Sequence, residues 1–316
     1  MTQRARPELT ALLALLAGAL AIGSSGIFVR VSETGSVASA FWRGALALPP
    51  LALWALLERR TADATGAAPR RAWLLQPGFL WAGAFFACDI ALYHLSLART
   101  SVGAATLEAN TAPIVVTILA WVLWGERPRL GFLLATLGAF GGLLLIVSPK
   151  LLAGGHDLAG DLMALGAAWL YGAYILAVAR LRGRFGTGTI MFASTLIFSA
   201  LLLPASLLMG EKLFPDTARG WLLLFGLALS AQAVGQSLIA YALAHLRATF
   251  GSLGLYVQVI AAAVYAWALL GERLRPVQLA GGAIVLLAIA LARAAHAPHA
   301  AAAPASEAAP AAAPPA

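Results

Sequence analysis

The segment LARTSVGAATLEANTAPIVVTILAWVLWGERPR at residues 97–129 has a second copy, LAHLRATFGSLGLYVQVIAAAVYAWALLGERLR, at residues 243–275. The two copies align at a constant offset and share the ending Ala-Trp-x-Leu-x-Gly-Glu-Arg-x-Arg. Each copy ends an apolar stretch, and one further apolar stretch follows it. The chain is therefore predicted to consist of two repeated halves, at residues 9–149 and 158–295.

The composition indicates which class of protein these halves form. Hydrophobic residues make up 61% of the chain and charged residues 11%, whereas soluble domains have about 45–50% and about 25%. The single Cys88 excludes a disulfide scaffold, and the net charge of +8 comes from Lys and Arg scattered between apolar stretches. That scatter excludes a nucleic-acid-binding patch. A membrane protein with several spans is the remaining class.

A transmembrane helix needs about 20 mostly apolar residues, and the sequence predicts ten of them. We expect residues 1–8 to be a cytoplasmic N-terminus and the Ala/Pro-rich residues 296–316 to be a disordered tail. Arg4 and Arg6 before the first apolar run also fit a signal peptide, but its removal would break the repeat. The predicted spans are 9–29, 37–57, 78–98, 102–124, 130–148, 161–179, 188–209, 220–244, 248–270 and 276–295.

The number of spans per half determines the predicted topology. Five is odd, so the second half enters the membrane from the opposite side, and the two halves form an inverted repeat. Secondary transporters with this architecture bind substrate near the midplane between the halves. With both termini in the cytoplasm, the inner segments hold more Lys and Arg than the outer ones, as the positive-inside rule requires. One chain can be a complete unit, with a homodimer as the alternative.

Several motifs resemble the EamA-type members of the drug/metabolite transporter superfamily. They are Phe41-Trp42-Arg43, LSLARTSVGAATLEANTAPI at 95–114, LIAYALAHL at 238–246 and the two Gly-Glu-Arg elements. The resemblance implies an all-α membrane protein with ten spans in two EamA repeats. It also implies an exporter or exchanger of small metabolites, in the inner membrane of a bacterium.

Two positions depart from the family pattern. Val259 stands where proline is usual, so we expect a weaker helix break there than at Pro113, its counterpart in the first half. Glu108 stands where an apolar or small residue is expected. We interpret the Gly-Glu-Arg elements as helix ends rather than catalytic groups, because the two would face opposite sides of the membrane.

Three charged residues lie well inside predicted spans: Arg43, Asp89 and Glu108. A charge at this depth costs at least about 2.5–3.5 kcal/mol and marks a functional site by default. Arg43 and Glu108 lie at similar depths, about 9–10 Å from the outer ends of their spans, so a structural ion pair is one interpretation. In the other, Arg43 binds a substrate carboxylate, and Asp89 or Glu108 binds a substrate amine or a proton.

Further polar and aromatic residues complete the predicted central site. Tyr93 shares a helix face with Asp89, and Gln232 shares one with Gln236. Each of these residues also has a structural interpretation, as an inter-helix hydrogen-bonding group or an interfacial aromatic. The candidates are Tyr93, His94, Asn110, Trp169, Tyr171, Tyr174, Gln232, Gln236, Tyr256 and Gln258.

Together these features predict a secondary transporter that works by alternating access and moves a small metabolite such as an amino acid. Exchange of protons or substrate would drive it, because the sequence has no Walker-type loop. We expect no cofactor, no metal, no catalysis and no nucleic-acid partner. A membrane-embedded enzyme is one alternative, but no His-Glu-x-x-His or Gly-x-Ser-x-Gly motif is present. A membrane scaffold is the other, and it would need longer inter-span loops.

Overall fold

The computed structural model describes residues 5–64, 76–97, 99–100, 102–125, 127–152, 157–246, 248–271 and 274–296. In this part of the chain every regular element is a helix. The predicted tail from 297 onward and Glu126, Glu272 and Arg273 of the Gly-Glu-Arg elements lie outside the described residues. The helices are α1 Ala5–Gly23, α2 Ser25–Arg30, α3 Ser36–Ala45, α4 Leu48–Ala64, α5 Pro77–Leu97, α6 Val102–Ala109, α7 Ala112–Trp124, α8 Leu130–Leu151, α9 Leu158–Leu181, α10 Thr187–Leu208, α11 Ala218–Leu227, the π-helix η2 Ala228–Gln236, α12 Ser237–Ala242, α13 Ala248–Gly254, α14 Val257–Leu270 and α15 Pro276–His296.

The outer surface of the bundle is apolar. Among the described residues, nine segments are long and apolar enough to cross a membrane, from Leu9–Arg30 to Ala248–Leu269. The tenth predicted span falls on α15, whose apolar part, Pro276–Ala292, is shorter. Large side chains such as Trp81 and Leu222 are more than half exposed, which suits hydrocarbon rather than water. The chain is therefore a multi-pass membrane protein.

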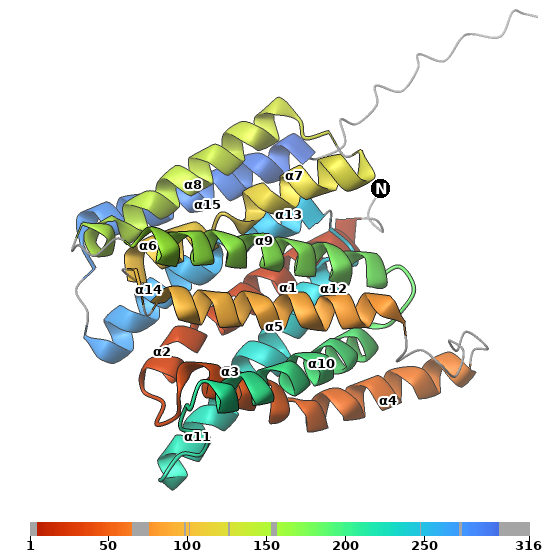
Figure 1. Ribbon diagram of the computed structural model, residues 1–316. Coiled ribbons are helices and arrows are strands. Elements are labelled where there is room, and N and C mark those ends of the chain that lie inside the picture. The colour runs from red at the N-terminus through yellow and green to blue at the C-terminus, as the bar shows by residue number, and fades with distance from the viewer. Residues whose placement is uncertain are drawn as a thin grey trace, which may run out of the picture.

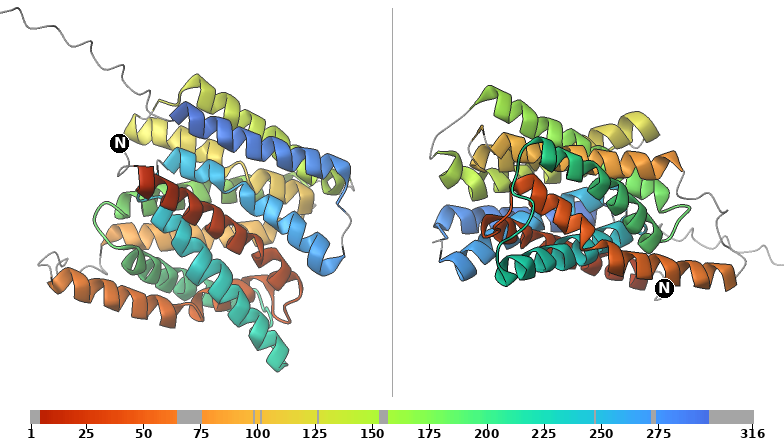
Figure 2. Two further views of the ribbon diagram at one scale, coloured as in Figure 1. Left: turned by 180° about the vertical axis from the view of Figure 1, so that it is seen from behind. Right: turned by 60° about the horizontal axis from the view of Figure 1, so that its bottom comes forward.

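The helices of the two halves pair in a symmetric way. The second helices of the halves, α3–α4 and α10, pack together, and so do the last helices, α8 and α15. The third helix of each half packs on the first helix of the other: α5 on α9, and η2–α12 on α1. Figures 1 and 2 show α8 with α15 at one edge of the bundle and α4 with α10 at the opposite edge. Exchanging the halves leaves this set of neighbours unchanged.

Three spans of the first half are broken part of the way along their length. Pro49 and Pro50 lack a backbone N–H, and the second span is divided into α3 and α4 just before them. Ser24 separates α1 from α2, and residues 110–111 separate α6 from α7 just before Pro113. Broken helices leave backbone groups free to line a cavity inside a membrane protein.

The ninth span is also broken, although Val259 replaces the proline there. The helix is interrupted between α13 and α14, at the same place in the repeat as the break between α6 and α7. Our expectation of a weaker break was therefore wrong. At Gly254 a Cβ atom would overlap the side chain of Leu15, and the backbone continues through i→i+3 hydrogen bonds such as Tyr256 N–H to Leu253. Close packing of α1 thus accompanies the break that proline was expected to cause.

Equivalent glycines end the helices that carry the repeated motif. Gly125 closes α7 with φ +69° and Gly271 closes α14 with φ +70°. Glycine adopts this left-handed conformation without the steric penalty of other residues. The first residue of each Gly-Glu-Arg element therefore has the predicted helix-end role.

Each second helix begins with a carboxylate supplied by the other half. The N-cap of α3 is Gly35, and Glu211 accepts the N–H of Ala38 at 2.7 Å. The N-cap of α10 is Gly186, and Glu58 accepts the N–H groups of Gly188 and Thr189 and the Thr189 hydroxyl. A glycine has no side chain to cap its own helix, and a Cβ at either glycine would overlap the incoming carboxylate. We call Glu58 and Glu211 the reciprocal caps.

Candidate functional site

A cavity of about 820 Å³ lies between the two halves. Its walls come from the broken helices α1–α2 and α6–α7, from α3, α5 and η2, and from the segment around the α13–α14 break. It extends to Arg30 at the end of α2, Val147 near the end of α8 and Gln278 at the start of α15. These three positions lie at one end of the bundle, so the cavity opens toward that end.

Arg43 lines this cavity from the last turn of α3. Its Nε donates a hydrogen bond to the Gln232 side-chain oxygen at 3.1 Å, and its Cζ lies 5.5 Å from the ring centroid of Phe86. Its Nη2 is buried and has no hydrogen-bond partner among the described residues. A buried donor without an acceptor is costly, so this nitrogen is an available binding group.

Asp89 lies on α5, three residues after Phe86, and lines the same cavity. It lies near enough to Arg43 for electrostatic attraction. No ion pair joins the two side chains in the described structure. Arg43 and Asp89 are therefore oppositely charged neighbours in the cavity lining that make no direct ion pair.

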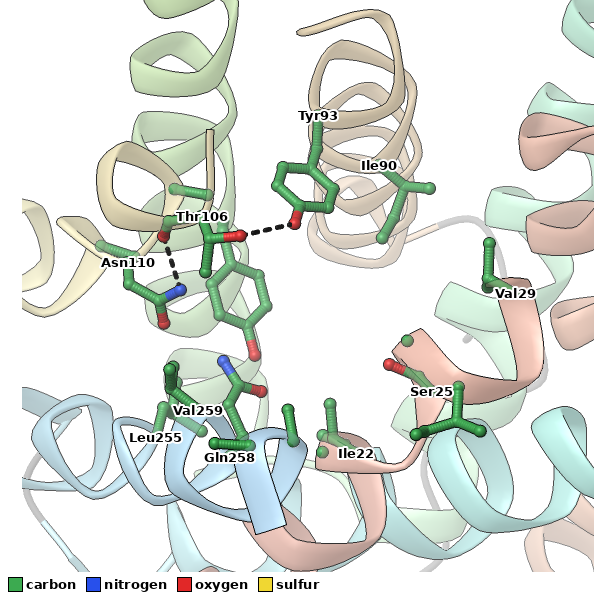
Figure 3. Close-up of a pocket in the computed structure, with 18 of the residues that line it drawn as sticks. Ile22, Ser25, Val29, Ile90, Tyr93, Thr106, Asn110, Leu255, Gln258 and Val259 are labelled. Carbon is green, nitrogen blue, oxygen red and sulfur yellow. Dashed lines mark hydrogen bonds between the residues drawn. The ribbon is translucent and has the colours of Figure 1, made fainter. Parts of the chain in front are cut away.

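A polar cluster of Tyr93, Thr106 and Asn110 covers one wall of the cavity (Figure 3). The Tyr93 hydroxyl lies 3.5 Å from the Thr106 hydroxyl, and the Asn110 amide donates to the Thr106 carbonyl at 2.8 Å. Gln258 faces this cluster from the second half, while Ser25 and Val29 form the opposite wall. Thr106 lies near the end of α6 and Asn110 follows it, and at this break the Asn110 amide and the Thr111 hydroxyl donate to the carbonyls of Thr106 and Glu108.

Two more predicted residues line the cavity with an atom that lacks a partner among the described residues. His94 follows Tyr93 on α5, and its Nδ1 is buried without a hydrogen bond. Gln236 ends the π-helix η2, and its Oε1 is likewise buried and unpaired. The Gln236 oxygen can only accept a hydrogen bond, whereas His94 Nδ1 accepts or donates according to its tautomer.

Five predicted site residues lie outside the cavity lining. Tyr174 is buried behind the wall and stacks on Phe86 with centroids 4.6 Å apart. Gln232 is buried between helices and contacts Arg43. Tyr256 is fully buried in the second half, and Trp169 is 48% exposed on the outer surface. Glu108 lies near Asp161 and is not itself a lining residue.

Gln232 and Gln236, which were predicted to share a helix face, have different surroundings. Gln236 lines the cavity, whereas Gln232 is buried in a helix interface and bonds to Arg43. Both belong to the π-helix Ala228–Gln236.

The ion pair between Arg43 and Glu108 that we considered as a structural role is not formed. Arg43 bonds to Gln232, and one oxygen of Glu108 is buried without a hydrogen bond among the described residues. The reason is helix placement. The main neighbours of α3 are α10, η2, α5 and α11, whereas α6 packs on α5, α8 and α9.

Several lining residues were not identified from the sequence, namely Ser25, Phe86, Thr106 and Gln278. Ser25 and Thr106 are small polar residues in apolar stretches, and their nearness to a helix break was the only available signal. Gln278 was taken as part of the last span. Its side chain in fact accepts the Arg275 N–H and donates to the Ile146 carbonyl.

Comparison with known proteins shows which family the chain belongs to. No curated protein matches the sequence. The fold matches 28 chains of solved structures. One of these, described only as the crystal structure of a protein, has 18% identity and a TM-score of 0.69, and the match covers 93% of this chain and 98% of that one. At that identity the likeness concerns the fold alone. The EamA-like transporter family model matches residues 9–148 and 158–294, and the chain therefore belongs to the EamA-like transporter family.

Proposed function

We propose that this protein is a secondary transporter that exports or exchanges a small zwitterionic metabolite, with amino acids as the leading class. One observation carries the proposal: Arg43 and Asp89 line the same cavity and are not paired with each other. Leaving two opposite charges apart in a low-dielectric site is costly. A ligand that carries both a carboxylate and an ammonium group can bridge them and recover that cost.

The surrounding groups fit the same ligand. Arg43 offers guanidinium N–H donors, which bind carboxylates in a bidentate manner. Asp89 offers a carboxylate to an ammonium group, and Gln236 adds an amide oxygen from the same cavity lining. Most of the remaining lining is apolar, for example Ile22, Ile90 and Val259, and this favours an amphipathic substrate.

The transport mechanism that we propose is alternating access of two inverted halves. The symmetric helix pairing and the helix breaks around the cavity support it, because such transporters rock one half against the other around a fixed site. With both termini in the cytoplasm of a bacterial inner membrane, the open end of the cavity faces outward. Exchange of protons or of substrate would supply the driving force, and a single chain builds the whole site.

The decisive experiment is counterflow of labelled amino acids and related metabolites in proteoliposomes. Asp89→Asn removes the cavity carboxylate. Glu108→Gln is the matched control, because it neutralises another carboxylate within a span but outside the cavity lining. We expect exchange of one class of zwitterion by the wild type, loss of exchange in Asp89→Asn and retention in Glu108→Gln. Wild-type protein that exchanges no member of the panel would contradict the proposal.

A further inference from the structure

Gln232 does not line the cavity, yet it contacts Arg43, a lining cation whose Nη2 has no hydrogen-bond partner among the described residues. We infer that Gln232 is a positioning residue that fixes the plane of the Arg43 guanidinium and thereby makes the site selective for a carboxylate. This inference rests on the proposed function, since it concerns how the same cavity recognises its substrate.

Three buried side chains from three helical segments form a linear chain of hydrogen bonds. Thr195 of α10 accepts from the Gln232 amide nitrogen at 2.9 Å, and the Gln232 oxygen accepts from Arg43 Nε at 3.1 Å. The exposed fractions of Thr195, Gln232 and Arg43 are 0%, 1% and 7%. This series of hydrogen bonds therefore connects the core of the second half to Arg43 in the first half.

The direction of each bond in this chain is determined by chemistry. Arginine has only donors, so the Gln232 group that faces Arg43 must be its oxygen. The Gln232 nitrogen then faces Thr195, whose hydroxyl can accept. The amide consequently has one satisfied orientation, and a rotated amide would place N–H groups against the guanidinium.

The hydrogen bond to Gln232 occupies one edge of the Arg43 guanidinium, the edge that carries Nε. Nε is bonded to Gln232, and the Phe86 ring lies over one side, with Cζ 5.5 Å from its centroid. The edge formed by the two Nη groups is left for a ligand, and Nη2 has no partner among the described residues. A carboxylate can occupy that edge with two parallel hydrogen bonds, whereas a neutral amide offers a single oxygen.

If Gln232 positions Arg43, its loss should weaken binding of the carboxylate end of a ligand and leave binding of the amine end unchanged. A merely structural role would weaken both ends together. The two ends can be separated by comparing an amino acid with its carboxamide, which keeps the ammonium group and lacks the carboxylate.

The test measures competition by an unlabelled amino acid and by its carboxamide against counterflow of the labelled amino acid. The variants are Gln232→Leu and the near-isosteric Thr195→Val. The matched control is Ser194→Ala, which removes a neighbouring buried hydroxyl that bonds only to its own helix backbone, at Ile190 and Met191. We expect Gln232→Leu to raise the half-maximal amino-acid concentration by about tenfold and to leave the carboxamide value unchanged. Thr195→Val should give a smaller shift in the same direction, and Ser194→Ala none.

Equal weakening of amino acid and carboxamide in Gln232→Leu would overturn this inference while the proposed function stands. If Gln232→Leu does not fold, Thr195→Val decides the matter by the same comparison. Absence of exchange by the wild type would overturn the proposed function, and this inference with it.

Discussion

Gly142 of α8 and Gly281 of α15 face each other so closely that neither can carry a side chain. A Cβ atom on Gly142 would lie 2.7 Å from the Gly281 carbonyl oxygen, and one on Gly281 would lie 2.5 Å from the Gly142 carbonyl oxygen. Small residues allow such close approach between membrane helices. Because α8 and α15 end the two halves, this contact joins the halves through backbone atoms.

Alanine at either glycine should separate α8 from α15. We expect Gly142→Ala and Gly281→Ala to lower the free energy of unfolding by about 1–3 kcal/mol, because the new methyl group meets backbone that cannot yield. Gly141→Ala is the control, since nothing lies within 4 Å of a Cβ at that position. Thermal unfolding in detergent measures the difference. A Gly142→Ala protein as stable as Gly141→Ala would contradict the described crossing.

The reciprocal caps should each stabilise the packing of α3–α4 against α10. Replacing Glu58 or Glu211 by glutamine removes a negative charge from a helix N-terminus and leaves one accepting oxygen instead of two, so we expect a loss of about 0.5–2 kcal/mol per site. Glu58→Gln should cost more, because Glu58 accepts three hydrogen bonds and Glu211 one from the helix it caps. Asp216→Asn, at an exposed surface pair with Lys212, should change stability little. Equal effects of all three substitutions would argue against the caps.

Acidic pH should loosen the loop contact made by Glu33. The side-chain hydrogen bond from Thr217, together with the backbone N–H groups of Thr217 and Asp216, holds the pKa of Glu33 below its usual value of 4.5. A lowered pKa means that this carboxylate stabilises the fold above pH 4.5 and loses that effect as the pH falls through the lowered value. The melting temperature of Glu33→Gln should therefore be below that of the wild type at pH 7, and the difference should shrink as the pH falls below 4.5. A difference that stays constant as the pH is lowered would contradict this role.

Access to the cavity can be tested with a single engineered cysteine. After Cys88→Ser, the substitution Ser25→Cys places a thiol on the cavity wall, and Leu222→Cys places one on the exposed apolar surface. A membrane-impermeant thiol reagent should modify Ser25→Cys from outside the cell and should not modify Leu222→Cys, because the thiolate forms only in contact with water. Modification from the cytoplasmic side alone would reverse the orientation that we propose.

The sequence alone was informative about the fold because its main signals are periodic and local. Apolar length predicted the spans, and the repeated Ala-Trp-x-Leu-x-Gly-Glu-Arg motif predicted the two-part organisation, in agreement with the family match over 9–148 and 158–294. The break after Gly254 was underestimated because it coincides with a tertiary contact from Leu15 rather than with a proline.

The candidate site was harder to predict, because it depends on which way each side chain points. Arg43, Asp89 and Tyr93 were found as polar residues in apolar spans, and all three line the cavity. Gln232 and Gln236 were both predicted to line the site, but only Gln236 does, and the π-helix that contains them has no signature in a single sequence. Glu108 and Trp169 have the expected chemistry but lie outside the cavity lining, which only the packing of α6 and α9 determines.

The reciprocal caps also impose an order on synthesis at the ribosome. The N-terminus of α3 is capped by Glu211, which lies 173 residues after Ala38, the residue whose N–H it accepts. At about 5–20 residues per second, translation needs roughly 10–35 s to supply that carboxylate. During this interval the N-terminal N–H groups of α3 lack the carboxylate that caps them. The first half therefore completes its hydrogen bonds only after Glu211 of the second half has been made.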